Sequence, residues 1–174
     1  MGHKPEIENA ARKGMPNVRD RLPELSRAGS NKVTGQTIEV LFKYHCMKRG
    51  LIPHTPEGDP PCHDMAVFNS QTGKIRTVQV KSTSSFKSSN NKGDQVYPRK
   101  GNYKIKAKCL GDKIDLKDTY VDTLVIYIPP HNTWYIIPVY KITASVINLF
   151  PHINNSRGKY EKYKDNWKAF GKTV

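Results

Sequence analysis

The hydrophobic positions of the chain follow two kinds of spacing, one helical and one alternating. Between residues 35 and 49 they recur every three or four positions, which predicts an amphipathic helix that Thr34 caps and Gly50 ends. A second helix is predicted over residues 158–170, where aromatic residues share one side. The apolar face of the first helix consists of Ile38, Leu41, Phe42 and Cys46, and the aromatic stripe of Tyr160, Tyr163, Trp167 and Phe170.

Between these helices, alternation with a period of two predicts β-strands. Residues 64–69 and 75–83 form a predicted hairpin, with a compact turn over 70–74 that contains Gly73. Further strands are expected over 103–109, 123–128 and 134–139. The proline-rich stretch 51–61 and the Ser-, Asn- and Lys-rich stretch 82–100 are predicted loops. The element order therefore predicts an α/β fold.

The 174 residues provide for one ordinary domain with a short appendage. Pro and Gly interrupt residues 1–33 every few positions, so we predict a mildly basic N-terminal extension there and a single domain over residues 34–174. Because its basic residues outnumber its acidic ones, the extension is compatible with a solvated arm or with an arm that contacts a polyanion such as DNA. No apolar run reaches the length of a membrane span. The N-terminus lacks the apolar core of a secretory signal, so an intracellular protein is expected.

The net charge and the cysteine content limit the kinds of partner and site that the chain can have. The chain has 29 Lys and Arg against 15 Asp and Glu, a formal net charge of +14. Such an excess favours a polyanionic partner, of which nucleic acid is the commonest. The three cysteines, Cys46, Cys62 and Cys109, are widely spaced. They predict neither a disulfide framework nor a CxxC metal site.

The candidate chemistry lies on the predicted hairpin. Asp64 opens its first strand, and Gln79 and Lys81 share one face of the second strand because side chains alternate. Glu39 of the preceding helix can reach the same end of the sheet. Asp64, Gln79 and Glu39 offer the oxygen ligands that Mg²⁺ prefers. Lys81 can orient a water molecule and offset charge on a reacting phosphate, so the set suits phosphodiester hydrolysis with Mg²⁺, or with Mn²⁺ in its place.

The spacing of these residues resembles the PD-(D/E)XK nuclease superfamily. The motif that carries the resemblance is Asp64, a hairpin, and then Gln-Val-Lys at residues 79–81. The likeness is closer to small Gln-x-Lys variants of the superfamily, which include group I intron-encoded homing endonucleases. It spans roughly residues 35–170. It implies a restriction-endonuclease-like core, with a central mixed β-sheet flanked by helices. It also implies that Glu39, Asp64, Gln79 and Lys81 are catalytic, with Gln79 in place of the second acid.

A group of basic residues follows Lys81 along the chain and is predicted to contact double-stranded DNA. Its alternating members would form a lysine ladder on one strand face, spaced like successive phosphates. A lysine-guarded edge strand is the ordinary alternative. The predicted DNA-binding residues are Lys87, Lys92, Arg99, Lys100, Lys104, Lys106 and Lys108.

Other interpretations of the same residues stay open. Glu39 and Lys43 stand four residues apart and could form a helix-surface ion pair. The chain could be a structure-selective nuclease of the Holliday-junction resolvase kind, or a basic DNA-binding protein of the same fold without activity. One site cuts one strand, so a double-strand endonuclease would need a homodimer or a higher symmetric assembly.

Overall fold

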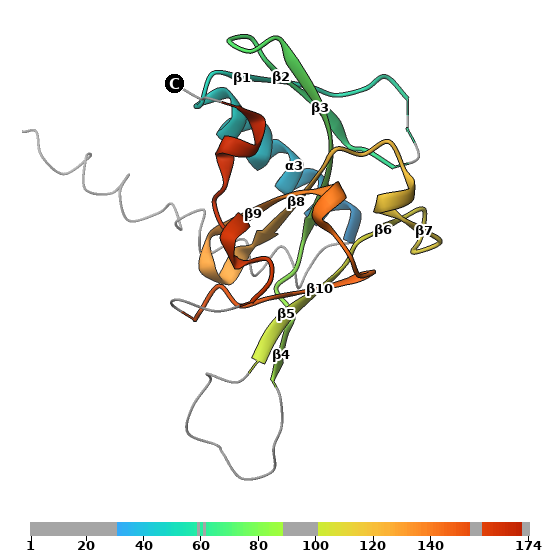
Figure 1. Ribbon diagram of the computed structural model, residues 1–174, viewed down its shortest axis with the longest axis vertical. Helices are drawn as coiled ribbons and strands as arrows, with labels where there is room; N and C mark the ends of the chain where they lie inside the picture. The colour runs from blue at the N-terminus through green and yellow to red at the C-terminus, as the bar shows by residue number, and fades with distance from the viewer. Residues whose placement is uncertain (1–30, 59, 61, 89–100, 154–157, 172–174) are drawn as a thin grey trace, which may run out of the picture.

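A mixed five-stranded sheet organises the chain. The computed structural model describes residues 31–58, 60, 62–88, 101–153 and 158–171. The strand order is β1-β2-β3-β8-β9, in which β3 and β8 are parallel and the other neighbours antiparallel (Figure 1). These strands are β1 (Leu51–His54), β2 (Met65–Asn69), β3 (Lys74–Ser82), β8 (Thr123–Ile128) and β9 (Thr133–Pro138).

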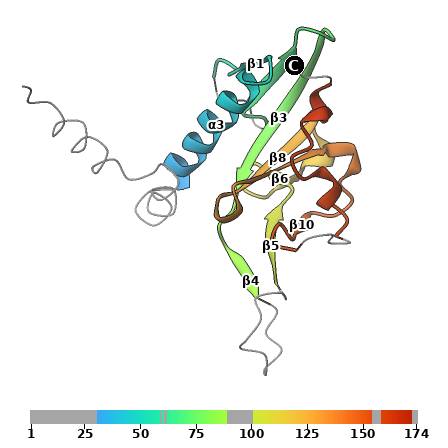
Figure 2. The same ribbon diagram turned by 90° about the vertical axis from the view of Figure 1, so that its left-hand side faces the viewer.

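One face of this sheet is covered by the helix α3 (Asn31–Met47) (Figure 2). Ile38, Phe42 and Cys46 are buried on its inner side, as the helical spacing predicts, and they share a core with Val78 and Val80 of β3. The helix begins four residues before the predicted start, so Thr34 lies within it rather than at its cap. The predicted extension lies outside the described residues except for its last positions, which belong to α3.

The opposite face is covered by a second sheet with the order β10-β5-β4. Its strands are β4 (Phe86–Ser88), β5 (Gly101–Lys106) and β10 (Val146–Leu149). Tyr103 and Ile105 of β5 point into a core with Leu124 and Ile126 of β8. Because β8 has a core on each side, all six of its residues are buried. The hydrophobic run 123–128 reflects this position in the middle of the molecule.

The parallel pairing of β3 with β8 requires a crossover connection. Here the crossover contains β4, β5, the short strands β6 (Lys108–Cys109) and β7 (Ile114–Asp115), and the 3-10 helix η1 (Leu116–Asp118). The strand predicted over 103–109 is divided at Ala107, whose N–H donates to Ser145 O at 2.8 Å while its carbonyl accepts from Leu116 N at 2.9 Å. These two bonds direct the chain from one small sheet to the next.

Three predictions of local structure are wrong. The predicted loop 82–100 contains strand β4, which pairs with β5. The stretch 51–61 contains strand β1, in which Pro53 pairs with Val67; an edge strand tolerates proline because one side of its backbone needs no ladder partner. The helix predicted over 158–170 is instead two 3-10 helices, η4 (Glu161–Tyr163) and η5 (Trp167–Phe170). Two further 3-10 turns, η2 (Pro129–His131) and η3 (Val139–Lys141), flank β9.

The C-terminal segment wraps around the free edge of β9. Asp165 N–H donates to Trp134 O at 2.7 Å, and Trp134 N–H donates to Asp165 Oδ1 at 3.2 Å. Tyr163 packs in the core opposite α3, whereas Trp167 stacks on Phe42 of α3 with ring centroids 5.7 Å apart. The four aromatic residues of the predicted stripe are therefore buried, but they serve two cores instead of one helix face.

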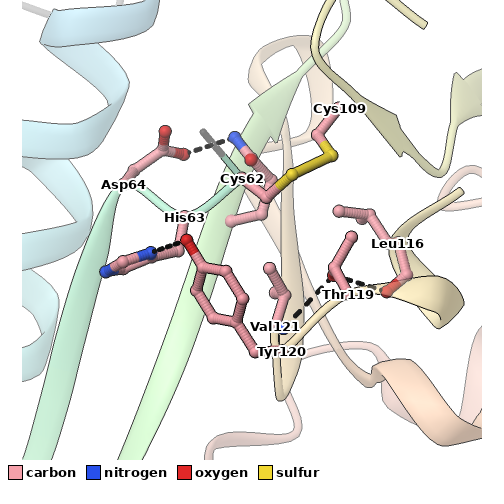
Figure 3. The surroundings of a disulfide bond; sticks show 9 residues. Cys62, His63, Asp64, Cys109, Leu116, Thr119, Tyr120 and Val121 are labelled. Carbon is pink, nitrogen blue, oxygen red and sulfur yellow. Dashed lines mark hydrogen bonds between the residues drawn. A yellow bond between two sulfur atoms is a disulfide. The ribbon is translucent and has the colours of Figure 1, made fainter. Parts of the chain in front are cut away.

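Cys62 and Cys109 form a disulfide, contrary to the sequence prediction (Figure 3). Their Cα atoms lie 5.4 Å apart although 47 positions separate them in the chain. The prediction failed because wide spacing says nothing about proximity, and the crossover brings β6 next to the residues that precede β2. Within the described residues, no helix is both long and apolar enough to cross a membrane.

Candidate active site

Asp64 is held at the point where β2 begins. Met65 is the first residue of β2 and pairs with Val78, and Asp64 N–H donates to Val78 O at 2.8 Å. Strand β3 continues beyond this point while β2 does not. The N–H of Val80 consequently has no strand partner on that side, and it donates instead to Asp64 Oδ2 at 2.6 Å. The backbone of β3 thus fixes the orientation of the Asp64 carboxylate.

Gln79 lies beside Asp64, on the sheet face opposite α3. Its Nε2 donates to Asp64 Oδ2 at 2.7 Å. Because Val78 and Val80 point toward α3, Gln79 and Lys81 both point the other way, on the face they were predicted to share. The amide of Gln79 therefore donates a hydrogen bond to Asp64. It does so from the position at which a metal ligand would have to offer an oxygen atom to the cation.

Glu39, on α3, interacts electrostatically with Asp64. The side chain is half-buried, and burial raises its pKa, with the negative charge of Asp64 adding to the increase and Lys43 opposing it. Lys43 does not form the ion pair that the spacing allowed, since its Nζ donates to Thr55 Oγ1 at 2.5 Å. Two carboxylates on different elements therefore act on one another at the start of β2.

Lys81 is half-buried in the same neighbourhood. Burial lowers the pKa of its ammonium group, and the charges of Asp112 and Asp64 act in the opposite direction. An ammonium group in such surroundings depends on nearby carboxylates to remain charged. Asp64 thus bonds to Gln79 and interacts electrostatically with Lys81 and with Glu39, so it links side chains from three separate elements.

The donor atoms of this set suit a hard cation. Two carboxylates and one amide oxygen are the kind of ligands that Mg²⁺ takes while keeping several waters. No group of three His, Cys, Asp or Glu side chains that could hold a metal occurs in the part of the chain that the structure describes. Gln79 contributes an amide to this set where a third carboxylate could stand.

The basic residues predicted to contact DNA are only partly described. Lys87, Lys104 and Lys106 share the outer face of the β4–β5 pair. Lys108 lies on β6, in another sheet, where its Nζ is 3.7 Å from Asp115, so the predicted ladder of three lysines is divided. Lys92, Arg99 and Lys100 lie outside the described residues.

Two side chains next to this site were not among the predicted site residues. His63 Nδ1 and the Tyr120 hydroxyl lie 3.0 Å apart, and Figure 3 shows the His63 ring directed at Tyr120 and away from Asp64. Asp112 comes from the β6–β7 turn and interacts electrostatically with Lys81. The Gly111–Asp112 pair signals a turn, but nothing in the sequence places that turn beside Lys81.

Comparisons with known proteins support the fold. No protein-family model matches the sequence, and no curated protein is significantly similar to it. Among solved structures, the chain is similar to a bacterial homing endonuclease, I-Ssp6803I, with a TM-score of 0.58 and 22% sequence identity; the match covers 80% of this chain and 89% of that one. The two chains share their fold. The predicted α/β architecture, with a mixed central sheet of the restriction-endonuclease-like kind, is thereby confirmed.

Proposed function

We propose that the protein is a metal-dependent DNA endonuclease of the PD-(D/E)XK type, which hydrolyses phosphodiester bonds. The observation that carries this proposal is the 2.7 Å hydrogen bond from Gln79 to Asp64, together with the electrostatic interactions of Asp64 with Lys81 and with Glu39. The shared fold with a homing endonuclease and the net charge of +14 support a DNA substrate.

Asp64, Gln79 and Glu39 would hold the metal ion, which we propose to be Mg²⁺ with Mn²⁺ as a substitute. When bound there, it supplies Lewis-acid polarisation of the phosphoryl group and acidifies water. The Val80 N–H fixes the orientation of Asp64, so little reorganisation of that carboxylate is needed on binding. Glu39 supplies the second negative charge that Gln79 does not carry.

Lys81 acts on the reacting phosphate from within the protein. Its half-buried position keeps the ammonium group poorly hydrated, which strengthens its interaction with charge that develops on the phosphoryl oxygens. It also provides a donor that can orient the attacking water. The exposed lysines of the β4–β5 face would hold the backbone of the duplex beside this site.

A plasmid-cleavage assay with and without Mg²⁺ or Mn²⁺ tests the proposal. Wild type is compared with Asp64→Asn and Lys81→Met, and with the exposed controls Asp118→Asn and Lys117→Met. We expect metal-dependent cutting by wild type and both controls, a loss of about 100-fold or more in both site variants, and DNA binding in all five proteins. Branched DNA and genomic DNA are included because a rare target sequence would hide the activity on one plasmid.

The outcomes separate the alternatives. Cutting of branched DNA regardless of sequence would identify a resolvase, whereas binding without cutting on every substrate would identify an inactive DNA-binding protein. Equal activity of Lys81→Met and Lys117→Met would contradict the proposed site. We further propose that the active form is a homodimer or a higher symmetric assembly, which sedimentation analysis with and without a duplex would test.

A further inference from the structure

Asp112 occupies a tight turn at the edge of the candidate active site. The backbone of Leu110, Gly111 and Asp112 has positive φ angles of 49°, 64° and 69°, so the hairpin between β6 and β7 turns through three left-handed residues in succession. The Asp112 side chain is 43% exposed and forms an ion pair with Lys106 Nζ. A carboxylate is therefore presented to solvent at the end of a compact loop.

Three lysines surround this carboxylate. The hydrogen bond from Lys106 is the largest cause that lowers the pKa of Asp112, and the charges of Lys81 and Lys108 act in the same direction. Lys106 belongs to the outer face of β5, and Lys81 belongs to the candidate active site. Asp112 thus pairs with a cation predicted to contact the DNA backbone and interacts electrostatically with a cation proposed for catalysis.

The disulfide fixes this hairpin beside the active site. Cys109 immediately precedes the turn, three positions before Asp112, and its partner Cys62 lies two positions before Asp64. Both cysteines are buried, at 5% and 6% exposure. One covalent bond consequently ties the strand start that carries Asp64 to the loop that carries Asp112, so the loop has little freedom to move away as a whole.

We propose that Asp112 is an internal substitute for a DNA phosphate. In the free protein it pairs with Lys106 beside Lys81, and a backbone phosphate of the bound duplex takes its place. The inference rests on the proposed function in one respect, that DNA is the substrate. Since each duplex must break this pair and bring its phosphate near the displaced carboxylate, Asp112 weakens the affinity for DNA of any sequence and so limits non-productive binding.

Binding of a fluorescein-labelled duplex of about 30 base pairs with mixed sequence, followed by anisotropy without metal, tests the inference. The full chain is compared as wild type, Asp112→Asn and Asp118→Asn, the last being an exposed acid that undergoes the same change of charge. Asparagine tolerates left-handed backbone, so the turn is retained in the variant. We expect Asp112→Asn to bind about 3–10 times more tightly than wild type, and Asp118→Asn to differ by less than about twofold.

A double-mutant cycle with Lys106→Gln identifies the contact responsible. In the Lys106→Gln background the gain from Asp112→Asn should fall to that of the Asp118 control, because the cation that the carboxylate blocks is gone. Equal affinity of Asp112→Asn and Asp118→Asn, or weaker binding of Asp112→Asn, would overturn the inference. Wild type that binds but never cuts would refute the proposed function and leave this comparison intact, whereas wild type that binds no duplex would refute both.

Discussion

Replacing Gln79 by glutamate tests the proposed metal site directly, because it puts a negative charge where the amide now donates a hydrogen bond. Gln79 Nε2 lies 2.7 Å from Asp64 Oδ2, and the charge of Glu39 already acts on Asp64. In Gln79→Glu a new carboxylate would lie beside Asp64, on which Glu39 already acts. Without a cation these carboxylates repel one another. With a cation, the new glutamate provides the acid that the PD-(D/E)XK pattern has at this position.

The cost in the metal-free protein follows from the geometry. The variant loses a hydrogen bond to a charged group, which contributes about 1.5–3 kcal/mol. Two carboxylates about 4 Å apart repel by roughly 4 kcal/mol at an effective dielectric constant of 20. Because residue 79 is half-buried, rotation toward solvent relieves much of the repulsion. We therefore expect the free energy of unfolding to fall by about 2–4 kcal/mol at pH 8.

The destabilisation has a definite dependence on pH. Repulsion raises the pKa of the new carboxyl pair in the folded state above the unfolded value of about 4.3. The folded variant then binds more protons at this pair than the unfolded one, so the stability that the pair contributes is greatest at low pH and is lost as pH rises through the folded pKa. The difference from wild type should be small at pH 4 and fully developed at pH 8.

Urea unfolding followed by tryptophan fluorescence, with and without Mg²⁺, measures these effects. The exposed Gln71→Glu variant is the matched control. Mg²⁺ should stabilise Gln79→Glu more than wild type, through an affinity that is about tenfold higher, equivalent to roughly 1.4 kcal/mol at saturating metal. If the variant is as stable as Gln71→Glu without metal and gains nothing from Mg²⁺, Gln79 does not face a cation site and the reasoning fails.

Three further predictions concern neighbouring features. Burial and the charge of Asp64 raise the pKa of Glu39, so its ionised form lowers the stability of the folded protein above that pKa. Glu39→Gln should therefore raise the free energy of unfolding of the metal-free protein at pH 8 by up to about 1 kcal/mol, and it should abolish cleavage. Urea melts and plasmid nicking check the two effects. Joint replacement of Cys62 and Cys109 by serine should cost up to about 4 kcal/mol, since the bridge closes 47 positions, whereas a melt unchanged from that of oxidised wild type would refute this. Tyr135→Phe should cost about 1–2 kcal/mol in thermal melts through loss of its 2.7 Å bond to Glu161, with Tyr140→Phe as the exposed control.

The parts of the fold that local pattern determines were predictable from the sequence. The β2–β3 hairpin and the strands β8 and β9 follow from alternation and uninterrupted apolar runs, and α3 follows from helical spacing. Asp64 and Gln79 could be placed together because a hairpin fixes which residues of its two strands are neighbours. The candidate site was predictable to the extent that it depends on this one hairpin.

What the sequence did not reveal depends on contacts between distant segments. The aromatic stripe at residues 160–170 has helical spacing, yet Asp165 bonds to Trp134 and directs the two halves to opposite faces of the sheet. The disulfide and the position of Asp112 follow from the course of the crossover. No local spacing encodes that course, because it is set by the way the chain leaves β5 at Ala107.

The central position of β8 has a consequence for the order in which the molecule can assemble. Its parallel partner β3 lies far back in the chain, with Thr77 and Asp122 in contact across a separation of 45 positions. During synthesis the β2–β3 hairpin is therefore complete long before the strand that fills its open side. Once β9 has followed, the six buried residues of β8 can form the β8–β9 hairpin at once, but they join the sheet only when the crossover is in place. Long-range closure of this kind is slow, so the middle of this sheet should be the last part to gain protection from hydrogen exchange during refolding.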